Sequence, residues 1–309
     1  MANRSLDMNT PETFLAHINW PQWQNQQHKL YALLDCAHVP TDIWRTLHQQ
    51  SPNVVRRLFE GTPDEGLSSV EPLLLDALHP DAPGIMPWLT KHHTNYPMVL
   101  WLACPRSIGD VHKLLRSCLK ADLPDAPDAL LRFYDPRVFA KLMQVLQPQQ
   151  QALFFGVARH WWAWDARAGV LRVYAAHQEQ MNSSRPMRLS AEQMQRFSEL
   201  DVADFVHDVQ NHLIKEQKQL KHVQGLRPDA LNQHVQNHVD KAVSFGIETE
   251  DNIKAYVVCV AASLGWAFDQ GGHDRVVAIL TDTRHDEDTK QQRLQAYCHT
   301  LNNSADTRS

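Results

Sequence analysis

The chain has 309 residues, a formal net charge of −5, 43% hydrophobic residues and 21% charged residues. Such a composition is typical of a globular protein that buries a sizeable core. The length predicts two domains, or one domain with a large extension. The mildly acidic balance gives no reason to expect nucleic acid or an anionic membrane as a partner.

The N-terminal sequence MANRSLDMNTPETF lacks the apolar stretch of a signal peptide. Apolar runs elsewhere stay well short of the ~20 residues that a membrane helix needs. The cysteines are odd in number, widely spaced and without a CxxC pair, which is typical neither of a disulfide framework nor of a zinc ribbon. They are Cys36, Cys104, Cys118, Cys259 and Cys298. We therefore expect a cytoplasmic protein with reduced thiols.

The first half of the chain predicts an α/β domain at residues 29–176, preceded by a helical or irregular lead-in at residues 1–28. Short apolar runs without strict alternation indicate strands that are buried on both faces, and we expect them to form a mixed or mostly parallel sheet with flanking helices. The expected strands are residues 29–35, 70–75, 97–103, 129–133, 152–157, 160–164 and 170–174. Apolar residues at helical spacing predict helices at residues 107–120 and 136–146.

The second half predicts an all-α lobe at residues 190–303, after a polar linker at residues 177–189. Ser190 with Gln193 three residues later indicates a capping box at the start of the first helix. Apolar residues then recur at threes and fours, and a last helix is expected at residues 286–301. The resulting prediction is a lobe of four or five helices.

Motifs that would indicate an enzyme are incomplete. The sequence has no GxGxxG, no P-loop and no GxSxG. Arg106 follows Cys104, but a phosphate-binding loop would need more glycines, and Cys36 with His38 is best explained as a chance pair. His234 and His238 have the spacing of metal ligands, yet Val235 stands where a zinc protease needs glutamate. We expect no catalytic residue, metal or cofactor. A hydrolase or metal-dependent enzyme that uses histidine or cysteine stays the alternative.

Three indoles lie within four residues at Trp161, Trp162 and Trp164. Strand alternation places Trp162 and Trp164 on one face of the sheet and Trp161 on the other. Core packing is the simplest explanation. Because tryptophan is enriched at the centres of protein interfaces, Trp162 and Trp164 are also candidate partner contacts.

The most specific segment is LRFYDPRVF at residues 131–139. An apolar run ends there, and Asp135 is a strong candidate to cap the N-terminus of a helix whose first residue is Pro136. Arg132 and Arg137 flank Asp135 and are expected to pair with it. The same two arginines offer a grip for a carboxylate of a partner.

This segment resembles the signature of a family long catalogued only as a domain of unknown function, whose members are adaptor chaperones of type VI secretion. In that family an arginine, two aromatics and Asp-Pro-Arg follow a strand, as do Arg132, Phe133, Tyr134, Asp135 and Arg137 here. The segments LLDCAH, VEPLLLD and FFGVARHWWAWD are similar to other parts of the same domain, so the resemblance covers residues 29–174. The helical half resembles the C-terminal lobe of the family less specifically.

The resemblance implies a non-enzymatic adaptor that binds a cognate type VI effector in the cytoplasm and promotes its loading onto the VgrG spike. The candidate partner contacts are Arg132, Tyr134, Asp135, Arg137, Trp162 and Trp164. A secreted toxin is a third reading, but it would need catalytic residues that the sequence does not supply.

Overall fold

The computed structural model describes residues 8–66, 70–94, 98–176, 187–216, 223, 225–262, 272–286, 288–290, 292–294 and 296–297. The chain divides into two compact units, Met1–Phe197 and Ser198–Ser309. Helix α8 (Ala191–Glu216) contains the division point. The predicted capping box is confirmed at its start, where the Gln193 backbone N–H donates to Ser190 Oγ at 3.2 Å and the Ser190 N–H donates to Gln193 Oε1 at 3.0 Å.

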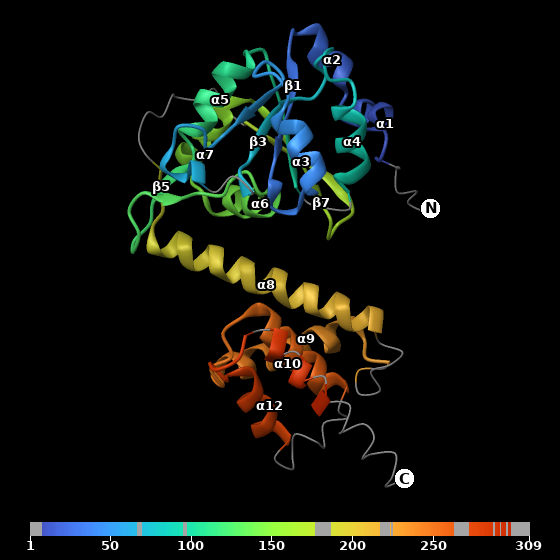
Figure 1. The fold of residues 1–309 in the computed structure, drawn as a ribbon, viewed down its shortest axis with the longest axis vertical. Helices are drawn as coiled ribbons and strands as arrows, with labels where there is room; N and C mark the ends of the chain where they lie inside the picture. Colours follow the sequence, from blue (N-terminus) through green and yellow to red (C-terminus); the bar gives the residue numbers. More distant parts are fainter. Residues whose placement is uncertain are drawn as a thin grey trace. The chain divides into compact units, whose positions relative to one another are not determined.

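A six-stranded sheet forms the centre of the first unit (Figure 1). The strand order is β2-β3-β1-β4-β7-β8, and every neighbouring pair is antiparallel. The strands are β1 (Lys29–Leu34), β2 (Val55–Arg57), β3 (Leu73–Asp76), β4 (Val99–Cys104), β7 (His160–Asp165) and β8 (Val170–Ala175).

Helices cover both faces of this sheet. Alternate residues of β1 belong to two different cores, with Tyr31 and Leu33 in one and Leu30, Ala32 and Leu34 in the other. The first core also contains residues of α5 (Ile108–Arg116), α6 (Pro136–Val145) and α7 (Pro148–Val157). The second contains residues of α1 (Pro11–His17), α2 (Trp20–Asn25), α3 (Thr41–His48) and α4 (Ile85–His92).

The prediction of a mixed or mostly parallel sheet is therefore wrong for the six-stranded sheet. It rested on apolar runs without alternation, which report burial on both faces of a strand. Helices on both faces bury an antiparallel sheet just as completely, so the pattern does not reveal the direction of the strands.

The predicted strand at residues 152–157 is also wrong, because these residues lie in helix α7. The helix begins at Pro148, and the Gln147 backbone N–H donates to Gln150 Oε1 at 2.8 Å. The segment is apolar on all sides, and periodicity alone does not separate such a buried helix from a buried strand.

A second, three-stranded sheet has the order β6-β5-β9. Its strands are β5 (Lys120–Asp122), β6 (Ala129–Leu130) and β9 (Met187–Arg188), so the strand expected at residues 129–133 is shorter than predicted. β9 pairs with β5 in parallel. The end of the predicted linker thus forms part of the first unit, whereas residues 177–186 lie outside the described residues.

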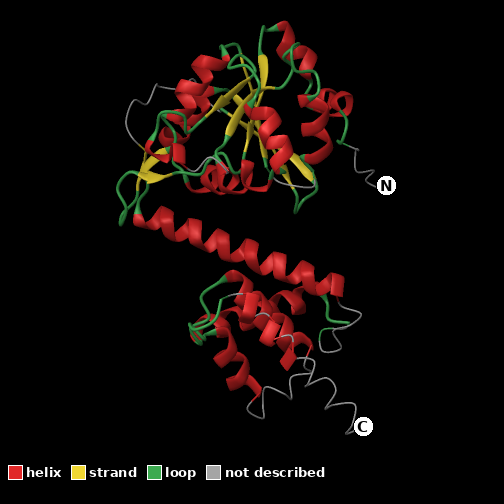
Figure 2. Cartoon of the chain, in the orientation of Figure 1, coloured by secondary structure: helices red, strands yellow, loops and turns green. Residues whose placement is uncertain are grey.

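The second unit is helical in its described part (Figure 2). Its helices include α9 (Pro228–Ser244), α10 (Glu250–Ala262) and α12 (Gly272–Leu280), of which α12 was not predicted. Leu231, Val235 and Val239 of α9 are buried in the core, whereas Val243, four residues after Val239, is exposed. Within the predicted last helix, residues 288–290, 292–294 and 296–297 are helical. Among the helices of the described residues, none combines the length and apolarity required to cross a bilayer.

Candidate interaction site at the signature segment

Asp135 caps the N-terminus of helix α6, as its sequence context predicts. Its Oδ1 accepts the backbone N–H of Arg137 at 2.9 Å, and Pro136 occupies the first turn, where a missing N–H costs little. The side chain of Asp135 is almost fully buried, so its charge has to be matched by donors. The local sequence therefore fixes where the helix starts and where this carboxylate sits.

Two arginines partner this carboxylate. Arg137 forms a fork on it, with Nε 3.0 Å from Oδ1 and Nη2 2.8 Å from Oδ2. Arg132 Nη2 lies 4.0 Å from Oδ2 of Asp135 and 3.4 Å from Oδ2 of Asp35. The predicted pairing of Asp135 with both arginines is confirmed, and Arg132 extends it to a second carboxylate far away in the sequence.

Asp35 lies directly after β1. Its Oδ1 accepts the backbone N–H of Ala37 at 3.1 Å and caps the short 3₁₀ helix η1 (Cys36–His38). The residue is 2% exposed. Burial raises the pKa of Asp35, and the negative charge of Asp135 raises it further, whereas the hydrogen bond from Ala37 and the charges of the two signature arginines lower it.

Tyr134 is buried and connects the signature to another loop. Its ring meets the ring of Phe59 edge-on at a centroid distance of 6.0 Å, and the guanidinium carbon of Arg132 lies 6.0 Å from the Tyr134 centroid. Burial raises the pKa of Tyr134 to about 12, so the phenol stays neutral at physiological pH. The guanidinium of Arg132 thus lies over a buried, neutral aromatic ring.

Glu71 is a third buried carboxylate, and it lies at the end of the sheet where β1 ends and β3 begins. Because Leu34 of β1 is paired with Leu73 of β3, the segment after β1 and the segment before β3 meet there. Glu71 is 0% exposed; its Oε2 accepts Arg57 Nε at 2.8 Å and its Oε1 accepts the Phe59 backbone N–H at 3.0 Å. The hydrogen bond to Glu71 raises the pKa of Arg57.

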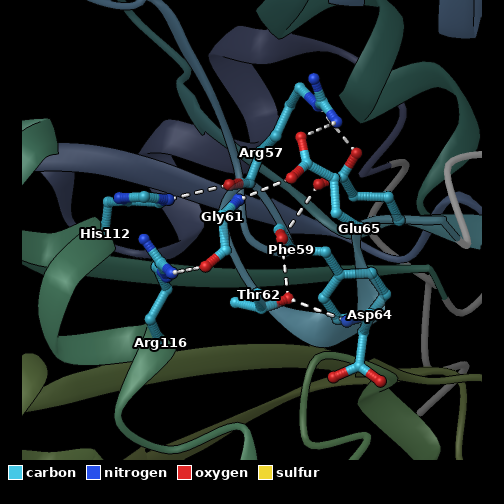
Figure 3. Close-up of polar contacts among 9 residues, drawn as sticks. Arg57, Phe59, Gly61, Thr62, Asp64, Glu65, His112 and Arg116 are labelled. Carbon is cyan, nitrogen blue, oxygen red and sulfur yellow. Dashed lines mark hydrogen bonds and ion pairs between the residues drawn. The ribbon is translucent and has the colours of Figure 1, made fainter.

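The loop after β2 is tied down by further polar contacts (Figure 3). Arg57 Nη2 reaches Glu65 Oε1 at 3.5 Å, and Glu65 Oε2 accepts the backbone N–H of Gly61 at 3.0 Å. His112 Nε2 lies 2.8 Å from the backbone oxygen of Arg57, and Arg116 Nη2 donates to the oxygen of Gly61 at 3.3 Å. Since a carbonyl only accepts, His112 carries its proton on Nε2. Helix α5 thus holds this loop in place.

The tryptophans follow the predicted alternation. Trp161 belongs to one core, while Trp162 and Trp164 pack on the other. Trp162 is 3% exposed and Trp164 is half-buried. Their packing supports a structural role, and a direct contact of either indole with a partner stays a prediction.

The candidate catalytic residues do not converge among the described residues. Cys36 and Cys104 are buried, and burial raises the pKa of each thiol away from the reactive thiolate form. The rings of His234 and His238 lie 4.5 Å apart. Across the described ranges, no group of three or more histidine, cysteine, aspartate or glutamate side chains is placed to hold a metal ion.

The site therefore consists of buried carboxylates beneath arginines that reach the surface. The side chains of Arg132 and Arg137 are 50% and 52% exposed, whereas those of Asp35 and Asp135 are 3% and 4% exposed. Guanidinium groups anchored in this way have a fixed geometry, and a planar guanidinium suits the carboxylate of a partner. The sequence interpretation missed Glu71 as part of this edge, although its position just before an apolar strand, like that of Asp35 just after one, was a usable signal.

Comparison with known proteins identifies a family model that matches part of the chain. No curated protein and no solved structure matched the chain. Residues 30–153 match the family model described as "Domain of unknown function (DUF4123)", a range that contains Asp35, Glu71 and the complete signature segment.

Proposed function

We propose that this protein is a type VI secretion adaptor that binds a cognate effector in the cytoplasm and promotes its loading onto the VgrG spike. The observation that carries the proposal is the match of residues 30–153 to the DUF4123 family, together with the signature that resembles the adaptor chaperones of type VI secretion. The proposed activity is binding, without chemical turnover.

Geometry supports the signature as a binding surface. Asp135 and Asp35 hold Arg132 and Arg137 in place, and Tyr134 packs beneath Arg132. Because these side chains are already ordered, forming a complex costs less conformational entropy. We assign the direct contacts to the two arginines, and to Tyr134 and Asp135 the role of positioning them.

The decisive experiment is co-purification of the tagged full-length chain with the effector and spike proteins encoded beside it, with the mass of the complex read by light scattering. A stable complex without substrate turnover is the expected result. A well-folded chain that captures neither neighbour would refute the proposal and would favour the enzyme alternative, to be pursued by metal analysis and activity screening.

A matched pair of variants tests the proposed surface. Replacing both Arg132 and Arg137 with alanine should weaken capture at least about tenfold, because a charge-assisted hydrogen bond contributes about 1.5–3 kcal/mol. Arg172→Ala is the control, since Arg172 is 55% exposed and paired with Asp165 on the hairpin of β7 and β8. Equal capture by both variants would show that Arg132 and Arg137 are not part of the interface. The effector would then have to bind another surface of the protein.

A further inference from the structure

A cavity of about 410 Å³ lies on the second unit. Helix α12 supplies Arg275, Ala278 and Ile279, and the other lining residues come from described positions that follow this helix in the chain. Its lining combines charged and apolar side chains: Arg275, Ala278, Ile279, Asp282, Arg284, Arg293, Ala296 and Tyr297. The lining thus holds three guanidinium groups and one carboxylate, in a chain whose overall charge is negative.

The carboxylate of Asp282 is already satisfied. Arg284 forms a fork on it, with Nε and Nη2 each 2.9 Å from an oxygen, and the Arg284 backbone N–H donates at 3.0 Å. Arg293 Nη1 lies 3.3 Å from the same carboxylate. These hydrogen bonds hold the pKa of Asp282 well below its usual range, so it stays ionised and anchors both arginines.

Arg275 is placed differently. Its guanidinium carbon lies 5.2 Å from the ring centroid of Tyr297, a cation–π distance. Within the described part of the chain, Arg275 forms no ion pair with a carboxylate. Arg275 therefore presents at the cavity a positive charge that packs against an aromatic ring and, among the described residues, has no carboxylate partner.

We infer that this cavity binds an acidic side chain of a protein partner. The arginines supply the charge complementarity for a carboxylate, and Arg275 with Arg293 supplies planar donors that suit it. The apolar lining of Ile279 and Tyr297 favours a carboxylate carried on a methylene stem over a fully hydrated inorganic anion. The inference rests on the proposed adaptor function only for the identity of the partner.

Binding is tested on the full-length chain with the peptide acetyl-Gly-Glu-Glu-Gly-amide, and the arginine Nε–H signals are followed by NMR. The glutamine peptide acetyl-Gly-Gln-Gln-Gly-amide, glutarate and inorganic phosphate are the comparison ligands. The glutamate peptide should bind, the glutamine peptide should not, and raising salt from about 50 to about 300 mM should weaken binding because the charges are partly screened. Equal binding of the two peptides would overturn the inference.

Two variants locate the site. Arg275→Gln should lower the affinity for the glutamate peptide about tenfold or more, while the hydrogen bonds to Asp282 stay intact. Arg227→Gln is the control, because Arg227 is an exposed arginine of the same unit whose side chain does not cap helix α9. An unchanged affinity in Arg275→Gln would refute the assignment.

Effector capture separates this inference from the adaptor proposal. If the wild-type chain captures the effector, Arg275→Gln should reduce capture and Arg227→Gln should not. Glutarate or phosphate binding as tightly as the glutamate peptide, with capture unaffected by Arg275→Gln, would make the cavity a small-anion site and overturn the partner assignment. Failure of the wild-type chain to capture any effector would count against the adaptor function alone, because the peptide measurement would still decide the chemistry of the cavity.

Discussion

Replacing His93 with phenylalanine should make the first unit less sensitive to acid. His93 is 1% exposed and sits among aromatic rings, with ring centroids 5.3 Å from Phe14, 6.1 Å from Trp101 and 5.9 Å from Trp164. Among the described residues neither ring nitrogen has a hydrogen-bond partner. The side chain therefore behaves as an aromatic core residue as long as it is neutral.

The size of the effect follows from the pKa. Burial lowers the pKa of His93 to about 4, against about 6.5 for an exposed histidine. Between these two values the unfolded chain binds a proton that the folded chain does not, so stability falls as pH drops below 6.5 and levels off below 4. The free energy of unfolding should lose about 2 kcal/mol by pH 5 and about 3 kcal/mol in total from this residue.

The measurement is urea unfolding at a series of pH values from about 7.5 to about 4.5, followed by tryptophan fluorescence. Every tryptophan except Trp266 lies in the first unit, so the signal reports mainly on that unit. The 18 histidines all contribute to the pH profile, and the difference between wild type and His93→Phe isolates one of them. His17→Gln is the control, because its side chain is exposed.

The expected result is a curve for His93→Phe that falls less steeply with acid than the curves of wild type and His17→Gln. Parallel curves for all three proteins would show that His93 titrates as it does in the unfolded chain. That outcome would refute the argument that its burial among aromatic rings excludes the proton.

Two further substitutions test the structural roles of the buried carboxylates Asp135 and Glu71. Asp135→Ala should lower the free energy of unfolding by about 0.5–2 kcal/mol through loss of the helix cap, whereas Asp135→Asn, which retains a capping oxygen, should cost less; loss of effector capture in Asp135→Ala with unchanged stability would contradict this structural role. Glu71→Ala should cost about 1–3 kcal/mol in urea unfolding, because the Phe59 backbone N–H and Arg57 lose their buried acceptor; a stability equal to wild type would mean that water replaces the carboxylate at this position.

Local features could be predicted from neighbouring residues. The cap at Asp135, the proline after it, the pairing with Arg132 and Arg137 and the capping box at Ser190 all depend on contacts between residues within three positions of one another. The alternation of Trp161 with Trp162 and Trp164 follows from strand geometry alone. The local sequence is therefore sufficient to predict these features.

Features that join distant segments were decided only by the tertiary structure. Burial of a strand on both faces does not reveal whether its neighbours run parallel or antiparallel. The apolar segment of α7 likewise fits a buried strand as well as a buried helix, and only its packing in the fold decides between them. Asp35 and Glu71 come to the same end of the central strands through the antiparallel register of β1 and β3, and Arg132 reaches Asp35 from a distant segment. Such contacts link residues up to 97 positions apart, and no local pattern encodes which distant carboxylate an arginine will find.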